Sequence, residues 1–399
     1  MKYIVVVPDG MADHPVEELG GKTPLQAANT PHMDELAAHG EVGTAKTVPP
    51  GLPADSAVAN LSVMGYDPAR WYTGRSPLEA VSMGIEMGPD DVAFRCNLVT
   101  LSEEGPYTGK VMADYSAGEI STDEAAPLIE AVQEALGDDL RRFYAGISYR
   151  HCMIWAGGPV GLDLTKPHDI LGRPIAEYLP DREKAPEIYD LMEKSMAVLA
   201  EHPVNQKRRE AGQNPANAIW LWGEGKKPAL PSFQETYGKK GAVISAVDLI
   251  KGIGRCAQMD VIEVTGATGN LHTNYAGKAK AALEALRQGA DLVYVHIEAP
   301  DECGHQADME GKIYSIEKID TEVIGWLREQ LQGTEYKMLV MPDHPTPLEL
   351  RTHTDEAVPF VIYDSTAPNK GPAQFSETAQ TSLHIEDGYQ LMARFLGRG

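Results

Sequence analysis

Short apolar runs alternate with amphipathic segments at both ends of the sequence, and this alternation limits the possible folds more than any other feature. Four runs have the length of strands: residues 3–7, 290–299, 336–344 and 358–364. Residues 30–40 and 273–289 show helical periodicity, and in the first of these Pro31 stands at the start and Gly40 just past the end. Strands that alternate with helices favour a parallel sheet covered on both faces. The sequence therefore predicts an α/β domain with a doubly wound, mostly parallel sheet.

The middle of the chain has a different pattern. Residues 141–155 alternate partly, as a half-buried strand does, and 214–225 reads as a short aromatic strand. Residues 184–202 have the periodicity of a helix, whereas 201–217 is polar and predicts a loop. We infer a smaller inserted α+β domain at 86–229. It would divide the α/β domain into residues 1–85 and 230–399.

Composition excludes several classes of partner. A length of 399 residues suits two domains, and a formal net charge of −23 argues against binding to nucleic acid or to an anionic membrane surface. The four cysteines form no C-x-x-C pair, which is typical of reduced thiols in a cytoplasmic protein. The first apolar run is too short for a signal sequence or a membrane span. We expect a cytoplasmic protein. An anionic small substrate stays possible if positive groups cluster locally, and the sequence does not indicate the oligomeric state.

Three of the expected strands end at an aspartate: Asp9, Asp301 and Asp343. A single aspartate after a strand is most often a turn residue. In an open parallel sheet, however, the carboxyl ends of the strands lie along one edge, where ligands bind. Because His305 and His344 accompany two of the three acids, the pattern favours one shared site over three separate turns.

The residue types in this set are those of a metal site. Asp301 and His305 form D-x-x-x-H in what reads as a tight polar loop, Asp343 and His344 are adjacent, and His353 precedes the last strand. Mixed carboxylate and imidazole ligands suit Zn²⁺ or Mn²⁺ better than Ca²⁺. So many ligands indicate two ions, about 4 Å apart. Cys303 is interpreted as a bystander. His384 stands at the start of an expected C-terminal helix at 383–396 and is interpreted as a helix-end or substrate-edge residue.

Ser56 admits two interpretations. Asp55 and Ser56 precede an apolar helix that begins at Ala57, so either residue could be its N-cap. Alternatively, Ser56 is a nucleophile, because a helix N-terminus favours both an alkoxide and a bound phosphate. A neighbouring divalent ion would lower the pKa of the hydroxyl further.

Together these motifs resemble the alkaline phosphatase superfamily, and more closely the archaeal-type cofactor-independent phosphoglycerate mutases. The stretches that carry the resemblance are VVVPDGMAD, GGKTPLQAANTPHMDELAAHG, PADSAVANLSVMGYDP, YTGRSPLEAVSMGI, FRCNLVT, DYSAGEIST, HIEAPDECGHQAD, MPDHPTP and RTHTDEAVPFVIY. The resemblance implies an isomerase that interconverts 2- and 3-phosphoglycerate through a phosphoserine, without 2,3-bisphosphoglycerate. It implies Mn²⁺, Zn²⁺ or Co²⁺ as cofactor, with one ion held by Asp9, Ser56, Asp343 and His344. The other ion would be held by Asp301, His305 and His353.

Substrate contacts are less specific in the sequence. The candidates lie in the inserted region and its approach: Arg75, Arg95, Asn97, Arg150 and His151. Arginines can grip carboxylate and phosphate with two hydrogen bonds, although each could equally be an ordinary surface residue. Other functions stay open, namely a homoserine kinase-like enzyme, a phosphomonoesterase or a non-catalytic metal-binding protein. The sequence has no G-x-x-x-x-G-K-[ST] loop, which weighs against an ordinary ATP site.

Overall fold

The computed structural model describes residues 1–379 and 381–398 and divides into two compact units. One unit joins Met1–Tyr72 to Ala229–Gly399, and the other is the intervening Thr73–Pro228. Residue 399, the last of the expected segment 230–399, lies outside the described part of the chain.

The first division falls after Tyr72, whereas the sequence analysis placed it after residue 85. The difference is due to the short helix α5 (Ser76–Ser82), which belongs to the inserted unit. Its Ser76 hydroxyl donates to the carbonyl of Gly223, and its Glu79 pairs with Arg95 at 2.9 Å. Both partners lie on strands of that unit, so α5 packs with them.

The larger unit is built on one sheet of eight strands. They are β1 (Lys2–Pro8), β2 (Glu41–Ala45), β8 (Gly241–Ile244), β9 (Asp260–Ile262), β10 (Leu292–Ile297), β11 (Tyr336–Val340), β12 (Val358–Asp364) and β13 (His384–Ile385). Their order across the sheet is β13-β2-β12-β11-β1-β10-β8-β9. The run from β11 to β9 is parallel, whereas β12 is antiparallel to both of its neighbours. The predicted mostly parallel sheet is confirmed.

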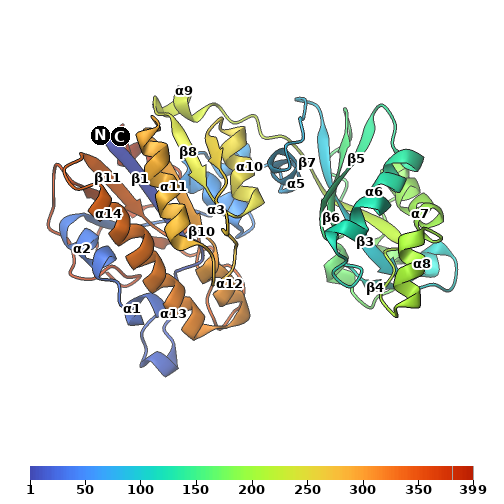
Figure 1. Ribbon diagram of the computed structural model, residues 1–399, viewed down its shortest axis with the longest axis horizontal. Helices are drawn as coiled ribbons and strands as arrows, with labels where there is room; N and C mark the ends of the chain where they lie inside the picture. Colours follow the sequence, from blue (N-terminus) through green and yellow to red (C-terminus); the bar gives the residue numbers. More distant parts are fainter. Residues whose placement is uncertain (380, 399) are drawn as a thin grey trace. The chain divides into compact units, whose positions relative to one another are not determined.

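Helices cover both faces of this sheet, as a doubly wound fold requires. They are α1 (Pro24–Ala27), α2 (Pro31–His39), α3 (Ser56–Val63), α4 (Pro68–Trp71), α9 (Phe233–Tyr237), α10 (Asp248–Cys256), α11 (Tyr275–Arg287), α12 (Ala299–Gln306), α13 (Met309–Lys318), α14 (Trp326–Gln330) and α15 (Gln390–Phe395). A π-helical segment, Ile319–Gly325, joins α13 to α14. Figure 1 shows α11 and α13 lying across the strands on one face.

Alternate residues of β1 explain why its apolar run is continuous. Ile4 and Val6 belong to the core beneath α2, α11 and α13. Tyr3 faces the other way and meets Phe395 of α15 edge-on, with ring centroids 5.6 Å apart. A parallel strand buried on both faces needs apolar residues at every position, and Tyr3–Val7 supplies them.

The sequence predicts the helix boundaries well where caps are present. Helix α2 begins with Pro31 at its first position, and Gly40 follows its last residue. The predicted C-terminal helix at 383–396 is wrong at its start. His384 and the next residue pair with β2 as β13, and α15 begins only at Gln390.

The inserted unit has its own sheet of five strands. They are β3 (Val92–Leu101), β4 (Met112–Asp114), β5 (Arg141–Ile147), β6 (Arg150–Trp155) and β7 (Ala218–Lys226). Strand β3 is central and pairs antiparallel with β4, β6 and β7. The expected single strand at 141–155 is instead the hairpin β5–β6, because Ser148 takes a positive φ of 56° and turns the chain back.

Three helices of the inserted unit, α6 (Thr122–Leu136), α7 (Pro186–Leu199) and α8 (Pro203–Glu210), lie on one side of this sheet, and α5 lies on the other (Figure 1). The polar segment 201–217 was expected to be a loop, but it contains α8. His202 caps α8 by accepting from the Val204 N–H at 3.3 Å. Arg208 of α8 is buried and donates to Glu124 at 2.8 Å. Hydrogen bonds of its cap and of a buried arginine, rather than an apolar stripe, therefore stabilise this helix.

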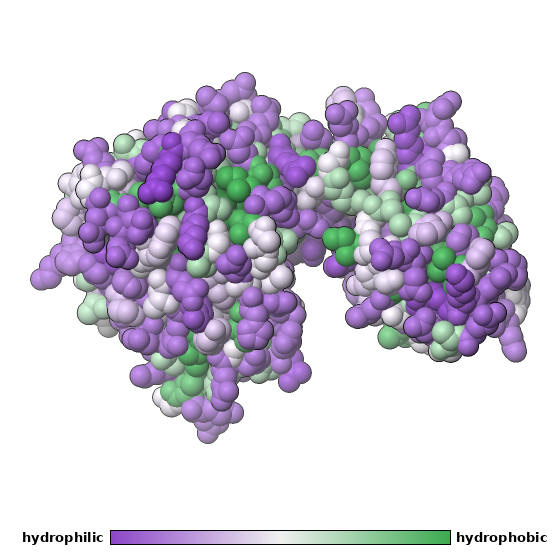
Figure 2. All heavy atoms as spheres, viewed as in Figure 1, coloured by the Kyte–Doolittle hydropathy of each residue, from purple (hydrophilic) through white to green (hydrophobic). Residues whose placement is uncertain are grey.

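The surface seen in Figure 2 is mostly hydrophilic, with apolar residues in small separate patches. Among the described residues, none of the helices combines the length and apolar character needed to cross a membrane.

Candidate metal centre

The three central strands of the large sheet bring the three predicted aspartates together. Strands β10, β1 and β11 are direct neighbours and parallel, so their carboxyl ends meet at one edge. Asp9 directly follows β1, and the N–H of Gly10 donates to Oδ1 of Asp343 at 3.2 Å. Asp9, Asp301 and Asp343 are all buried.

One group of donor atoms surrounds Nε2 of His344. This nitrogen lies 3.2 Å from Oγ of Ser56, 3.4 Å from Oδ2 of Asp343 and 3.5 Å from Oδ1 of Asp9. Ligands bound tetrahedrally at about 2.0–2.1 Å from a zinc-sized ion lie about 3.3–3.4 Å from one another. The three separations measured from Nε2 of His344 are of this size, as expected if these atoms share one ion.

A second group lies around Asp301. Its Oδ2 is 3.3 Å from Nε2 of His305, and its Oδ1 is 3.3 Å from Nε2 of His353. The Nδ1 atoms of the two rings lie 3.0 Å from the carbonyls of Arg351 and Ala54, respectively. A ring that donates from Nδ1 to a carbonyl leaves Nε2 with a free lone pair, which is the usual state of a metal-bound histidine.

Asp301 and His305 lie on helix α12, not in the tight polar loop expected from the sequence. The strand β10 ends at Ile297, and Pro300 stands at the first turn of the helix, where its fixed φ suits a helix start. The D-x-x-x-H spacing then places both side chains on one face of the helix, one turn apart.

His344 stands between the two groups, and its ring centroid is 4.0 Å from that of His353. The sets in which all donor atoms lie within 4.8 Å of one another are Asp301–His344–His353 and Asp9–His296–Asp343. This grouping differs from the division that the resemblance implies, because it includes His296 and places His344 with Asp301. Sequence reasoning missed His296, which looks like one more buried residue of β10.

The electrostatics of the cluster favour bound cations. Burial raises the pKa of Asp9 well above its ordinary value, and the charges of Asp343 and Asp301 raise it further. Oδ1 of Asp9 is buried without a hydrogen-bond partner among the described residues. Burial would also raise the pKa of Asp301, but its contacts with His305 and His353 hold this pKa well below the usual range. Buried carboxylates of this kind are normally paired or bound to metal, so the donor set fits divalent ions.

Ser56 is the first residue of helix α3, and it is not the residue that caps it. The cap is Asp55, whose side chain accepts from the N–H of Val58 at 2.9 Å. The hydroxyl of Ser56 is therefore free of the capping role that the sequence left open, and it faces His344.

Three further residues hold this cluster, and the sequence analysis did not find them. Asn60, one turn after Ser56, donates to Oδ2 of Asp343 at 2.7 Å and accepts from the hydroxyl of Tyr294 at 2.5 Å. Thr346 donates from its hydroxyl to Asp301. A buried asparagine within an otherwise apolar helix was the available signal.

Known proteins are similar to this chain over its whole length. A family model described as 2,3-bisphosphoglycerate-independent phosphoglycerate mutase matches residues 37–205. A Geobacter sulfurreducens protein with the name probable 2,3-bisphosphoglycerate-independent phosphoglycerate mutase is 54% identical, and the match covers 100% of both chains. The chain belongs to this family.

Solved structures agree with this membership. The cofactor-independent phosphoglycerate mutase from Thermoplasma acidophilum aligns with a TM-score of 0.69 and 30% identity, over 100% of both chains. A Pyrococcus horikoshii protein aligns with a TM-score of 0.84 and 29% identity, over 100% of this chain and 98% of its own.

In this mutase-family chain, the predicted substrate residues lie in the inserted unit, and most of them share one face of its sheet. Asn97 of β3 is paired with Arg150 of β6, and Arg95 is paired with Trp222 of β7. Directly paired residues point to the same side of a sheet. His151 is paired with Cys96 and therefore points to the opposite side, where it is buried.

The arginines on this face differ in their availability. Arg95 donates to both oxygens of Glu79 at 2.9 Å and lies 4.6 Å above the ring of Trp222, so its guanidinium is already engaged. Arg75 is half exposed, and its contact with the same glutamate is longer, with 3.8 Å between Nε of Arg75 and Oε1 of Glu79. Arg150 is exposed, and among the described residues no acidic side chain pairs with it. Arg150 is thus the freest cation of the set.

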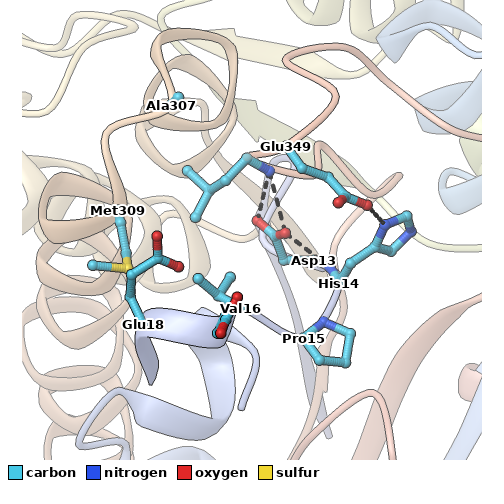
Figure 3. A pocket seen from close by; sticks show the side chains of 10 residues that line it. Asp13, His14, Pro15, Val16, Glu18, Ala307, Met309 and Glu349 are labelled. Atoms are coloured by element: carbon cyan, nitrogen blue, oxygen red, sulfur yellow. Dashed lines mark hydrogen bonds and ion pairs between the residues drawn. The ribbon is translucent and has the colours of Figure 1, made fainter. Parts of the chain in front are cut away.

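A separate pocket of about 510 Å³ opens in the larger unit (Figure 3). His14 on its wall contacts Glu349 at 2.7 Å, and Asp13 accepts from Lys312 at 2.7 Å. Other acidic residues that line it are Glu17 and Glu18. An acidic lining repels a phosphorylated ligand, so this pocket is no candidate for the substrate of a mutase.

Proposed function

We propose that the protein interconverts 2-phosphoglycerate and 3-phosphoglycerate through a phosphoserine at Ser56. Membership of the mutase family supports the reaction. The observation that carries the mechanism is the Ser56 hydroxyl, which lies 3.2 Å from His344 within the group of donors that includes Asp9 and Asp343. The serine is at a helix N-terminus without being its cap, so its hydroxyl is available for chemistry.

Asp9, Ser56, Asp343 and His344 would hold one divalent ion, and Asp301, His305 and His353 would hold a second. Mn²⁺, Zn²⁺ and Co²⁺ suit this mixture of carboxylate and imidazole better than Ca²⁺ does. Such ions, when bound, lower the pKa of a neighbouring hydroxyl and offset the negative charge of a phosphoryl group.

The protein's own groups account for the remaining steps. Oγ of Ser56 loses its proton and attacks phosphorus, and the bond from phosphorus to the ester oxygen of the substrate breaks. The ester oxygen gains a proton, which leaves glycerate and phosphoserine. The N-terminus of α3 favours the negative charge on the transferred group. The other hydroxyl of glycerate then loses its proton and attacks the phosphorus of phosphoserine, the bond from phosphorus to Oγ breaks, and Oγ of Ser56 regains a proton. No external phosphate donor is needed, in agreement with the name of the family.

Arg75, Arg95, Asn97 and Arg150 are the proposed substrate-binding residues of the inserted unit. Arg150 is the strongest candidate to bind the carboxylate or phosphate directly, because it is exposed and has no acidic partner among the described residues, although its guanidinium lies 5.6 Å from the ring of Tyr149. Arg95 would act mainly by holding Glu79 and Trp222 in place. His151 would support this face only from behind the sheet, since it is buried on the other side.

The direct test is an assay of the purified protein with 2- or 3-phosphoglycerate and Mn²⁺. We expect mutase turnover without added 2,3-bisphosphoglycerate, loss of turnover with excess chelator, and recovery with Mn²⁺, Co²⁺ or Zn²⁺ better than with Ca²⁺. Release of inorganic phosphate as the main product would instead identify a phosphomonoesterase. Phosphorylation of homoserine by ATP, with no mutase turnover, would identify a kinase.

A further inference from the structure

His296 lies at the centre of a buried chain of polar groups behind the metal centre. It is the fifth residue of β10 and is fully buried. Its Nε2 lies 2.9 Å from Oδ2 of Asp9, and its Nδ1 lies 3.2 Å from the hydroxyl of Ser245. Nε2 has no hydrogen-bond partner among the described residues, and neither has Oδ1 of Asp9. A buried imidazole nitrogen thus lies at hydrogen-bond distance from the carboxylate that would bind the first ion, but the two groups are not aligned as a hydrogen bond.

Ser245 is placed to set which ring nitrogen of His296 carries the proton, because its Oγ lies 3.2 Å from Nδ1. Its Oγ accepts from the N–H of Val247 at 3.0 Å, which leaves its own hydrogen to be donated. The nearby Nδ1 of His296 can accept this hydrogen, and a neutral imidazole that accepts at Nδ1 carries its proton on Nε2. The N–H of the ring then faces Asp9.

A third metal ion at His296 is disfavoured by charge. The cluster contains the carboxylates of Asp9, Asp301 and Asp343, which two divalent ions already offset. A third dication would add positive charge close to the buried Lys278, whose Nζ donates to the carbonyl of His296 at 3.1 Å. A neutral N–H donor adds no charge. A donor on His296 also suits the position of the Asp9 carboxylate. Oδ1 of Asp9 lies 3.5 Å from Nε2 of His344, whereas Oδ2 lies 2.9 Å from Nε2 of His296.

We propose that His296 is a positioning residue that donates from Nε2 to Oδ2 of Asp9 and so holds Oδ1 of this carboxylate toward the metal. Ser245 fixes the tautomer that makes this possible. The inference rests on the proposed metal site, but it concerns a residue outside the ligand set. Partners of this kind fix the orientation of a ligand, and their loss typically weakens metal binding by about 10- to 100-fold.

The test measures Mn²⁺ affinity by calorimetric titration of the metal-stripped full-length protein. His296→Phe keeps a planar ring and removes the donor, whereas His296→Gln keeps an N–H at a similar reach. We expect His296→Phe to weaken Mn²⁺ binding by about 10- to 100-fold and His296→Gln to stay within a few-fold of wild type. Ser245→Ala should weaken binding by a smaller factor, because the ring can then adopt the other tautomer. Ser315→Ala removes a buried hydroxyl that donates to the carbonyl of Lys312, and as the matched control it should change nothing.

Melting in excess chelator, compared with melting in Mn²⁺, separates this role from a purely structural one. A structural role would lower both melting temperatures equally, whereas a positioning role reduces the increase that Mn²⁺ produces. Wild-type affinity in His296→Phe would overturn the proposal. Affinity in His296→Gln as weak as in His296→Phe would overturn it too, since Nε2 would then act through its lone pair. If His296→Phe does not fold, wild-type affinity in Ser245→Ala overturns it. Wild-type protein that binds no Mn²⁺ would remove the proposed metal site itself.

Discussion

Replacing Ser56 with alanine distinguishes a nucleophile from a structural serine, and the structure allows the stability cost to be worked out. The N-cap of α3 is Asp55, so Ser56→Ala leaves the cap intact. The substitution removes one partly buried hydrogen bond, between Oγ and Nε2 of His344. Such a bond contributes about 0.5–1.5 kcal/mol to the free energy of unfolding. Asp55→Ala should cost about 0.5–2 kcal/mol, because it removes the cap itself.

The effect on catalysis should be far larger than the effect on stability. Without Oγ the chain has no atom at this position to receive the phosphoryl group, and mutase turnover should fall by several orders of magnitude. Turnover is measured in both directions with 2- and 3-phosphoglycerate, and stability is measured by thermal melting. Brief incubation of wild type with substrate should leave the mass of one phosphoryl group on the peptide that contains Ser56, and the alanine variant should show none.

Asp55→Asn is the matched control, because asparagine caps helices about as well as aspartate does. It should keep the melting temperature of wild type to within a degree or so. Near-normal turnover in a well-folded Ser56→Ala protein would refute the phosphoserine mechanism. A stability loss in Ser56→Ala greater than that in Asp55→Ala would refute the assignment of the cap.

Two further predictions concern the larger unit. The pKa of His14 is raised, chiefly by its hydrogen bond with Glu349 and then by Glu356. The two glutamates stabilise the folded protein through protonated His14. This stabilisation is fully present below the unfolded pKa of about 6.5 and is lost as the pH rises through the folded pKa. His14→Gln should therefore lower the melting temperature more at about pH 5.5 than at about pH 9. Gly10 has φ +63°, and an added Cβ would lie 2.7 Å from the Cα of Asp301, whereas Gly20 has φ +68° with nothing within 4 Å. Gly20→Ala should lower the free energy of unfolding by about 1–2 kcal/mol. Gly10→Ala should lower it by at least about 1 kcal/mol more and should also weaken Mn²⁺ binding. Equal losses of stability in thermal melting would show that the space around Gly10 does not matter.

The convergence of the three aspartates was predictable because it depends on a local pattern and one general rule. Each acid follows an apolar strand, and parallel strands present their carboxyl ends at one edge. The rule does not give the order of the strands, but β10, β1 and β11 prove to be neighbours. The helix that carries Asp301 and His305 was missed because α12 is short and largely polar. Pro300 just before Asp301 was the signal for a helix start.

The supporting residues could not be found in this way, because their contacts depend on the tertiary fold. Tyr294 and Asn60 are 234 positions apart, and each lies within an apolar segment where a polar group has no local partner. His296 has the same character, since only the pairing of β10 with β1 brings it to Asp9. A buried polar residue in a strand shows that a partner must exist, but it does not show which one.

In the inserted unit, strand alternation alone separates some of the predicted substrate residues from the others. Arg150 and His151 are consecutive in one strand, and consecutive strand residues point to opposite faces, so both could not contact one ligand on one face of the sheet. The structure places His151 on the buried side with Cys96 and leaves Arg150 exposed beside Asn97. The spacing of Arg95 and Asn97 was consistent with a shared face for the same reason. What strand alternation could not reveal is that Glu79, from a helix 16 positions earlier, already occupies the guanidinium of Arg95. The charge available for a phosphorylated substrate on this face is therefore set less by the number of arginines than by which of them lacks a carboxylate partner.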